Sequence, residues 1–171
     1  HRRLSIVDLS DASAQPMRRG DWVLANNGEI YGYQALRARL QAFGLDFRTT
    51  GDTEVLLNAW RHWGEACLDE LDGMFAFVIW DGKRAHAATD PFGEKPLYRA
   101  ETDDGIYVSS EMGPLVEALG LAPELGGDAL MAFLAIGNVP APHTAYPTVR
   151  RAPAAILMRI EGGRVTAERQ Y

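Results

Sequence analysis

Three consecutive polar residues, Asn27-Gly28-Glu29, follow directly after the apolar part of a predicted strand at residues 22–26. Gly28 lets a ligand approach the main chain closely and exposes its N–H. The side-chain amide of Asn27 beside that N–H would form a pair of donors suited to an oxyanion. The same residues are also typical of a hairpin turn, and on spacing alone the turn is the favoured interpretation.

The cysteine and the histidines, the other residues that could act as nucleophiles or metal ligands, show no pattern that indicates such a role. The single cysteine, Cys67, lies between Trp63 and Leu71 in an apolar helical pattern and is interpreted as an inert core thiol. One cysteine excludes an internal disulfide and favours a reducing compartment, for which we predict the cytoplasm. The histidines are scattered and show no metal-ligand spacing, so no metal is expected; they are His1, His62, His86 and His143.

Length and composition suit one globular domain. The chain has 171 residues, of which 47% are hydrophobic, and a net charge of -6. A negative charge argues against a nucleic-acid surface. No apolar run reaches the roughly 20 residues of a membrane-spanning helix, so we expect neither nucleic acid nor membrane as a partner.

The elements that must position these residues alternate between hairpins and groups of helices. Strands are predicted at 4–7, 22–26, 74–80, 84–89, 96–100, 106–109, 155–160 and 164–167, with a short extended piece at 47–49. Helices are predicted at 33–43, 65–70, 113–119 and 128–136, and another precedes Gly64 with Asp52 as its N-cap. Strand 74–80 is apolar on every residue, which predicts burial of both faces. The pattern indicates an α+β fold with two stacked antiparallel sheets and helices outside.

Six sequence blocks carry a family resemblance. They are His1-Arg2-Arg3-Leu4-Ser5-Ile6-Val7-Asp8, Gln15-Pro16-Met17, Asn27-Gly28-Glu29-Ile30-Tyr31, Gly51-Asp52-Thr53-Glu54-Val55, Asp72-Gly73-Met74-Phe75-Ala76-Phe77 and Gly93-Glu94-Lys95-Pro96-Leu97-Tyr98. In this order they resemble the N-terminal glutaminase domain of glutamine-hydrolysing asparagine synthetases, the class II glutamine amidotransferases. The resemblance covers most of residues 1–119, and residues 120–171 resemble the end of that domain more loosely.

The resemblance implies a fold and a set of roles. The fold would be a four-layer αββα sandwich of the N-terminal nucleophile hydrolase type. An N-terminal cysteine attacks the side-chain amide of glutamine, and Asn27 and Gly28 supply the oxyanion hole. By the same resemblance, Arg3 pairs with the substrate α-carboxylate, Glu29 and Asp52 hold its α-ammonium, and the backbone of Ile6 and Val7 lines the pocket. The structural alternatives are a surface role for Arg3 and a helix-capping role for Asp52.

The sequence also departs from the family pattern. The nucleophilic cysteine is absent from residues 1–171, and Cys67 does not match its position. We therefore expect a type 2 glutamine amidotransferase domain truncated at its N-terminus, inactive alone, with its core at 1–119. Residues 120–171 would lead toward an absent synthetase domain. Gly32 stands where the family usually has asparagine, and Thr89 replaces a common arginine, where we expect a structural role.

The expected partners are glutamine, a covalently attached C-terminal synthetase domain and, as a further candidate, a second copy in a homodimer. No cofactor is expected in this domain, whereas ATP and Mg²⁺ are expected in the synthetase domain, where ammonia would amidate aspartate. Two alternatives stay open. One is a non-catalytic scaffold like that of β-lactam synthetases, and the other is an amidotransferase with another carboxylate acceptor. The complete set of binding residues argues against a decayed pocket.

Overall fold

The computed structural model describes residues 7–122 and 124–171. Its larger sheet is antiparallel and has the strand order β1-β2-β3-β4-β8-β9. These strands are β1 (Met17–Arg19), β2 (Trp22–Tyr31), β3 (Asp72–Trp80), β4 (Arg84–Thr89), β8 (Ile156–Glu161) and β9 (Arg164–Gln170). The smaller sheet has the order β6-β5-β7, formed by β6 (Gly105–Ser109), β5 (Tyr98–Thr102) and β7 (Val149–Arg151).

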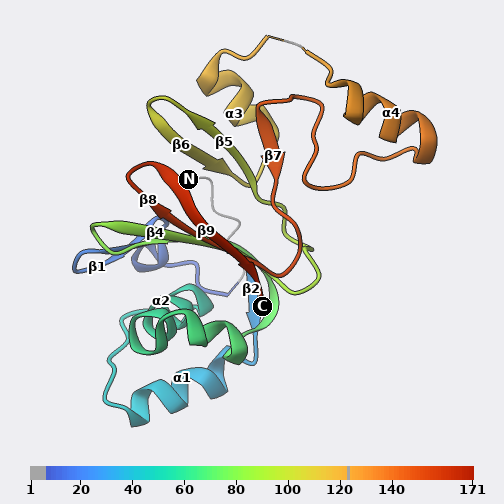
Figure 1. The fold of residues 1–171 in the computed structure, drawn as a ribbon. Coiled ribbons are helices and arrows are strands. Elements are labelled where there is room, and N and C mark those ends of the chain that lie inside the picture. Colours follow the sequence, from blue (N-terminus) through green and yellow to red (C-terminus); the bar gives the residue numbers. More distant parts are fainter. Residues whose placement is uncertain (1–6, 123) are drawn as a thin grey trace.

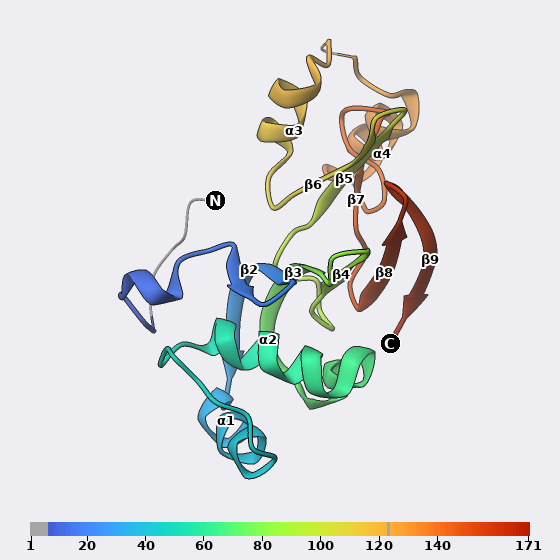
Figure 2. The same ribbon diagram turned by 90° about the vertical axis from the view of Figure 1, so that its left-hand side faces the viewer.

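Helices lie on the outer side of each sheet. They are α1 (Tyr33–Ala42), α2 (Asp52–Trp63), α3 (Met112–Leu119) and α4 (Gly127–Ile136), with 3₁₀ turns η1 (Asp11–Ser13) and η2 (Gly64–Glu70). Figures 1 and 2 show α1 and α2 below the larger sheet and the smaller sheet above it. Helix α3 lies on the side of the smaller sheet that faces away from the larger sheet. The order is therefore helix, sheet, sheet, helix, which confirms the predicted four-layer αββα sandwich.

Three apolar clusters fill the spaces between the four layers. The first joins α1 and α2 to the larger sheet through residues such as Leu40, Leu56 and Phe77. The second lies between the two sheets and includes Ala76, Leu97 and Met158. The third packs Leu115 of α3 against the smaller sheet. Burial of apolar area in each layer is what holds the layers together.

Strand β3 takes part in two of these clusters, as its apolar sequence predicts. Phe75, Phe77 and Ile79 belong to the first cluster, between the larger sheet and helices α1 and α2. Ala76 and Val78 belong to the cluster between the sheets. Successive side chains of a strand point to opposite faces, so both faces of β3 are covered.

Several predicted boundaries are wrong. Strand β2 does not end at Asn26 but continues to Tyr31. The helix predicted at 65–70 is present as the 3₁₀ helix η2, and the short extended piece at 47–49 belongs to neither sheet. The short strands β1 and β7 were not predicted. Most of the predicted strand 4–7 lies outside the described residues, and its last residue, Val7, is in a bend.

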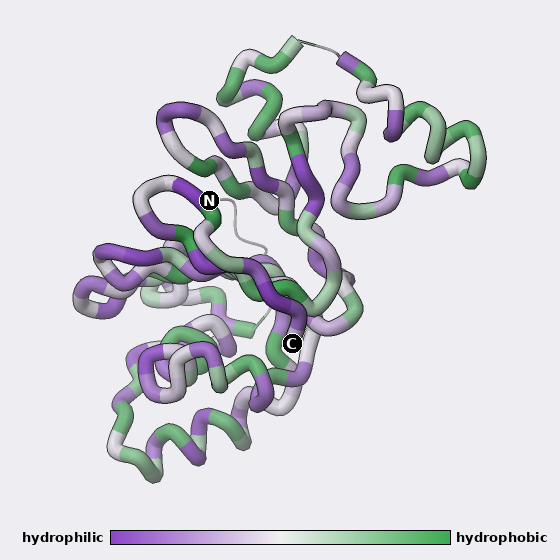
Figure 3. Tube along the Cα trace, in the orientation of Figure 1, coloured by the Kyte–Doolittle hydropathy of each residue, from purple (hydrophilic) through white to green (hydrophobic). Residues whose placement is uncertain are grey.

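Helix α4 stands away from the rest of the fold. In Figure 3 it is a largely green stretch at the upper right. Its exposed apolar side chains include Met131, Leu134 and Ile136, each at least 67% exposed, whereas Ala129 is buried. In the described part of the chain, no helix is long and apolar enough to cross a membrane.

Candidate functional site

The predicted oxyanion residues lie inside a strand and not in a turn. Asn27 and Gly28 are paired with Ala76 and Phe75 of β3, so the hairpin interpretation is wrong. Gly28 has φ 153°, and a Cβ at this position would lie 2.1 Å from the carbonyl oxygen of Met74. Glycine is therefore required here, because β3 approaches the main chain too closely for a side chain.

The main-chain N–H of Gly28 points away from β3. Its partner in register, Phe75, uses its own N–H and carbonyl oxygen for hydrogen bonds to Asp90 on the opposite side, at 3.2 and 2.8 Å. Gly28 and Phe75 are thus a non-hydrogen-bonded pair, in which neither main chain donates to the other. The N–H of Gly28 accordingly faces the free edge of β2, with no partner among the described residues.

Asp52 reaches the same edge from α2. Its Oδ2 accepts a hydrogen bond of 2.9 Å from the N–H of Ile30, two residues after Gly28. The N-cap of α2 is Gly51 and not Asp52, which corrects the predicted capping role. As the first residue of α2, the Asp52 carboxylate is favoured by the positive end of the helix dipole. The side chain is 7% exposed, and its Oδ1 has no partner among the described residues.

Val7 precedes Asp8, which is held beside the residues that lead into α2. Asp8 is buried, and its Oδ2 accepts hydrogen bonds from the N–H and hydroxyl of Thr50, at 2.7 and 3.0 Å. The hydroxyl and N–H of Ser10, with the N–H of Thr50, hold the pKa of Asp8 well below its ordinary value. Val7 is half-buried beside this anchor. Arg3 and Ile6, the other predicted binding residues, lie outside the described residues.

A cavity of about 520 Å³ opens between the two sheets, and Asn27 lines it. Ala25, Ala76 and Val78 form its floor on the larger sheet, and Ser109 and Glu111 lie on the side of the smaller sheet. Glu29 is half-buried and follows the same alternation along β2 as Asn27, so its side chain leaves the same face. Asn27, Gly28, Glu29 and Asp52 are therefore gathered at one end of β2.

The two departures from the family pattern have clear structural positions. Gly32 is exposed and precedes α1 with φ 59°, a left-handed conformation that both glycine and asparagine adopt readily. Thr89 is buried, and its hydroxyl donates to the carbonyl oxygen of Pro153 at 2.7 Å and accepts from the N–H of Ile156 at 3.2 Å. These bonds join β4 to the start of β8, which confirms a structural role for Thr89.

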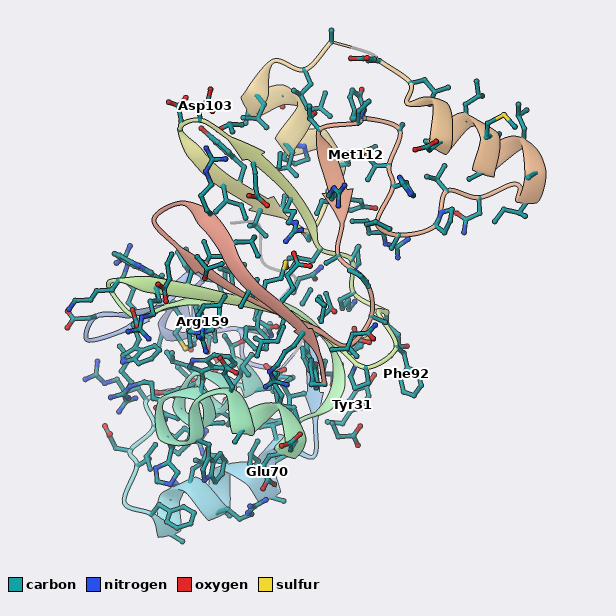
Figure 4. All side chains as sticks on the ribbon, in the orientation of Figure 1. Tyr31, Glu70, Phe92, Asp103, Met112 and Arg159 are labelled. Atoms are coloured by element: carbon teal, nitrogen blue, oxygen red, sulfur yellow. The ribbon has the colours of Figure 1, made fainter. Side chains whose placement is uncertain are left out.

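The sequence did not reveal the importance of Asp90. It is fully buried, and its carboxylate accepts hydrogen bonds of 3.0 to 3.2 Å from the N–H groups of Phe75, Phe92, Glu94 and Lys95. Burial alone would raise the pKa of Asp90, but the donors at Lys95, Glu94, Phe92 and Phe75 outweigh it and lower the pKa. The loop that it holds leaves Phe92 84% exposed. Figure 4 shows the Phe92 side chain at the outer side of this loop.

Cys67 is buried in η2 as predicted. Burial raises the pKa of its thiol, and the negative charge of Asp69 raises it further. A neutral buried thiol is a poor nucleophile, so Cys67 is a core residue. Among the described residues, no three or more His, Cys, Asp or Glu side chains are grouped so that they could hold a metal ion.

Comparison with known proteins identifies the family. A family model described as a glutamine amidotransferase domain matches residues 1–171. A putative glutamine-hydrolysing asparagine synthetase of Mycobacterium tuberculosis (strain ATCC 25618 / H37Rv) is 41% identical over 170 residues, covering 92% of this chain and 26% of that protein. The glutamine-hydrolysing asparagine synthetase 1 of Bacillus subtilis (strain 168) is 42% identical, covering 88% of this chain and 24% of that protein. The chain spans about a quarter of the length of these curated relatives.

The fold is also that of solved amidotransferase structures. The glutamine phosphoribosylpyrophosphate amidotransferase of B. subtilis superposes with a TM-score of 0.65 at 22% identity, covering 94% of this chain and 32% of that one. A glutamine aminotransferase class-II domain protein of Silicibacter pomeroyi gives 0.59 at 16% identity, covering 95% and 72%. This likeness confirms the sandwich of the N-terminal nucleophile hydrolase type.

Proposed function

Because the chain belongs to the glutamine amidotransferase domain family, we propose that the free edge of β2 binds glutamine and serves hydrolysis of its side-chain amide to glutamate and ammonia. The observation that carries this proposal is the N–H of Gly28. This N–H faces the free edge of β2 and is unpaired among the described residues. The neighbouring Asn27 lines the cavity between the two sheets.

In the proposed reaction, a thiolate attacks the amide carbonyl carbon of glutamine, and the electron pair of the carbonyl moves onto its oxygen. Gly28 N–H and the Asn27 side-chain N–H would donate to this oxyanion. The proton that the thiol loses on ionisation would pass through the α-amine of the same cysteine to the leaving nitrogen, so that collapse of the intermediate releases ammonia and leaves a thioester. Water then hydrolyses the thioester to glutamate and returns the thiol. The family resemblance assigns the thiolate to an N-terminal cysteine, and the buried Cys67 is not proposed for that role.

The charged ends of the substrate would be held by opposite charges. Glu29 and Asp52 are proposed partners of the α-ammonium, and the Oδ1 of Asp52 supports this because no other described residue uses it. Arg3 is the proposed partner of the α-carboxylate, since a guanidinium matches a carboxylate with two parallel hydrogen bonds. The backbone of Ile6 and Val7 is proposed to line the pocket beside the anchor at Asp8.

For the full-length protein we propose that the ammonia amidates aspartate in a covalently attached synthetase portion. The names and lengths of the curated relatives support this proposal. ATP and Mg²⁺ are assigned to that portion, and no step in this domain involves them. The cytoplasm stays the proposed compartment because the chain has one cysteine. A homodimer stays a proposal as well.

The test is ammonia release from L-glutamine by the natural full-length protein, together with its N-terminal sequence and intact mass. We expect a mature chain that opens on cysteine and releases ammonia from glutamine. The matched control is L-asparagine, whose side chain is one methylene shorter and should release little. A chain that opens on another residue and releases none would instead indicate a scaffold domain.

A further inference from the structure

The edge of β2 is covered in three different ways along its length. Strand β1 covers it only as far as Leu24, which pairs with Met17. Beyond this point, the Oε1 atom of Gln15 accepts a hydrogen bond of 2.6 Å from the N–H of Asn26. Asp52 accepts from Ile30 at 2.9 Å. These two side chains bracket Gly28, whose N–H stays open among the described residues.

The spacing makes this arrangement specific. The N–H groups of alternate residues point to the same side of a strand, so Asn26, Gly28 and Ile30 face the same edge. Each is about 7 Å from the next, since a strand rises about 3.4 Å per residue. Acceptors therefore occupy the sites on both sides of Gly28 and fix the direction of its N–H.

A regular continuation of β1 would close the open site. In the register that pairs Met17 with Leu24 and Arg19 with Trp22, Ser13 would lie opposite Gly28. The chain avoids this position, because residues 11–13 turn into η1, closed by a 3.1 Å hydrogen bond from the N–H of Ser13 to the carbonyl oxygen of Ser10. The Gln15 side chain takes the place of the main chain and satisfies Asn26, while the chain itself departs before it reaches Gly28.

We propose that Gln15 is a positioning residue for the oxyanion site, which rests on the function proposed above. Its side chain accepts from the N–H of Asn26, which is the last edge-facing N–H before that of Gly28. Gln15 therefore fixes the position of the β2 edge and leaves the N–H of Gly28 uncovered. Without this acceptor, the buried N–H of Asn26 loses its only partner among the described residues and the edge must shift. A displacement of about 1 Å at a reacting centre can lower the rate about 100-fold.

The test compares Gln15→Met with Gln15→Glu in the full-length protein. Methionine keeps the length of the side chain without an oxygen acceptor, whereas glutamate keeps an acceptor. We expect kcat for glutamine hydrolysis to fall about 10- to 100-fold in Gln15→Met, with KM for glutamine within about twofold. Gln15→Glu should stay within about threefold of the wild type. Gln34→Met, on the exposed face of α1, is the matched control and should change neither value.

A second readout needs no catalysis. In amide hydrogen exchange of this chain, the N–H of Asn26 should be protected and that of Gly28 should exchange fast. Gln15→Met should remove the protection of Asn26, and Gln15→Glu should keep it.

Unchanged protection of Asn26 in Gln15→Met, or a kcat of Gln15→Met equal to that of the wild type, overturns the proposal. If Gln15→Met does not fold, a folded Gln15→Glu with a comparable loss of kcat and of Asn26 protection also overturns it. Absence of any glutaminase activity in the wild type would overturn the proposed function instead, while the exchange result would still decide whether Gln15 holds the edge.

Discussion

Asn26 and Asn27 are neighbours on β2, yet their side chains leave opposite faces of the larger sheet. Asn26 lies opposite Phe77, in the layer under the helices, and Asn27 lies opposite Ala76, in the layer between the sheets. Asn26 is 4% exposed, and neither atom of its amide has a hydrogen-bond partner among the described residues. Asn27 lines the cavity between the sheets, which Asn26 also borders. An asparagine side chain therefore lowers the stability of the fold at position 26 and is a candidate catalytic donor at position 27.

Replacing the unpaired amide should stabilise the domain. We expect Asn26→Val to raise the free energy of unfolding by about 1 kcal/mol, because a buried polar group without a partner costs about 1–3 kcal/mol. Urea denaturation of this chain measures the change. Asn58→Val is the matched control and should destabilise, since the Asn58 side chain donates to the carbonyl oxygen of Asp46 and accepts from Arg61. A loss of stability in Asn26→Val would show that Asn26 has a buried partner.

Much of the fold could be predicted from local patterns. The apolar run of β3 and the hairpin signal at Asp81-Gly82 predict two adjacent strands, and the structure pairs them. The extension of β2 through Gly28 could not be predicted, because Asn-Gly is usually a turn signal. The glycine is required by the approach of the Met74 carbonyl from a strand that begins more than 40 residues later. Contacts of this kind depend on the tertiary structure.

The site was predictable in its residue types and not in its geometry. The resemblance assigns roles to Asn27, Gly28, Glu29 and Asp52, and the structure brings these residues to one end of β2. The motif containing Gln15 was recognised without a role for its side chain, because the acceptor position depends on where β1 ends. Asp52 was expected as a helix cap, but Gly51 takes that position and frees the carboxylate for the strand edge.

The charge of Asp52 should matter more than its hydrogen bond. Asp52→Asn keeps an oxygen acceptor for the N–H of Ile30 and removes the negative charge. We expect KM for glutamine to rise about 10- to 100-fold in the full-length protein, since hydrogen bonds to charged groups contribute about 1.5–3 kcal/mol. Ammonia-dependent synthesis should be unchanged. Asp128→Asn, at an exposed site of α4, is the control. Equal loss of both activities would contradict a role in glutamine binding.

Asp90 should make the domain sensitive to acid. Its pKa is lowered in the folded protein, because four N–H groups outweigh burial. Its stabilising effect is therefore fully present above the unfolded pKa of about 4 and is lost as pH falls through the folded pKa. Asp90→Asn should be less stable than the wild type at pH 7, and the difference should shrink toward pH 3.

Urea denaturation at both pH values measures this change. Asp103→Asn, at the exposed turn labelled in Figure 4, is the control and should behave as the wild type at both. A stability difference between Asp90→Asn and the wild type that is the same at pH 7 and pH 3 would contradict the ionised role of Asp90.

Cys67 should not react in the folded domain. The thiol is fully buried and burial raises its pKa, so thiolate is scarce at neutral pH. We expect labelling by a thiol reagent to proceed only as fast as the protein unfolds, and to become rapid in urea. Because the chain has a single cysteine, the labelled mass reports this site alone. Rapid labelling without denaturant would show that the thiol is accessible.

The central claim is that the Asn27 side chain and the Gly28 N–H stabilise an oxyanion formed from glutamine. The most direct measurement is kcat for glutamine hydrolysis by Asn27→Ala in the full-length protein, beside its rate of ammonia-dependent synthesis. Loss of one oxyanion donor typically lowers the rate about 100- to 1,000-fold. We predict a loss of that size in glutamine hydrolysis and an unchanged ammonia-dependent rate. A kcat within a few-fold of the wild type would contradict the assignment of Asn27 to the oxyanion site.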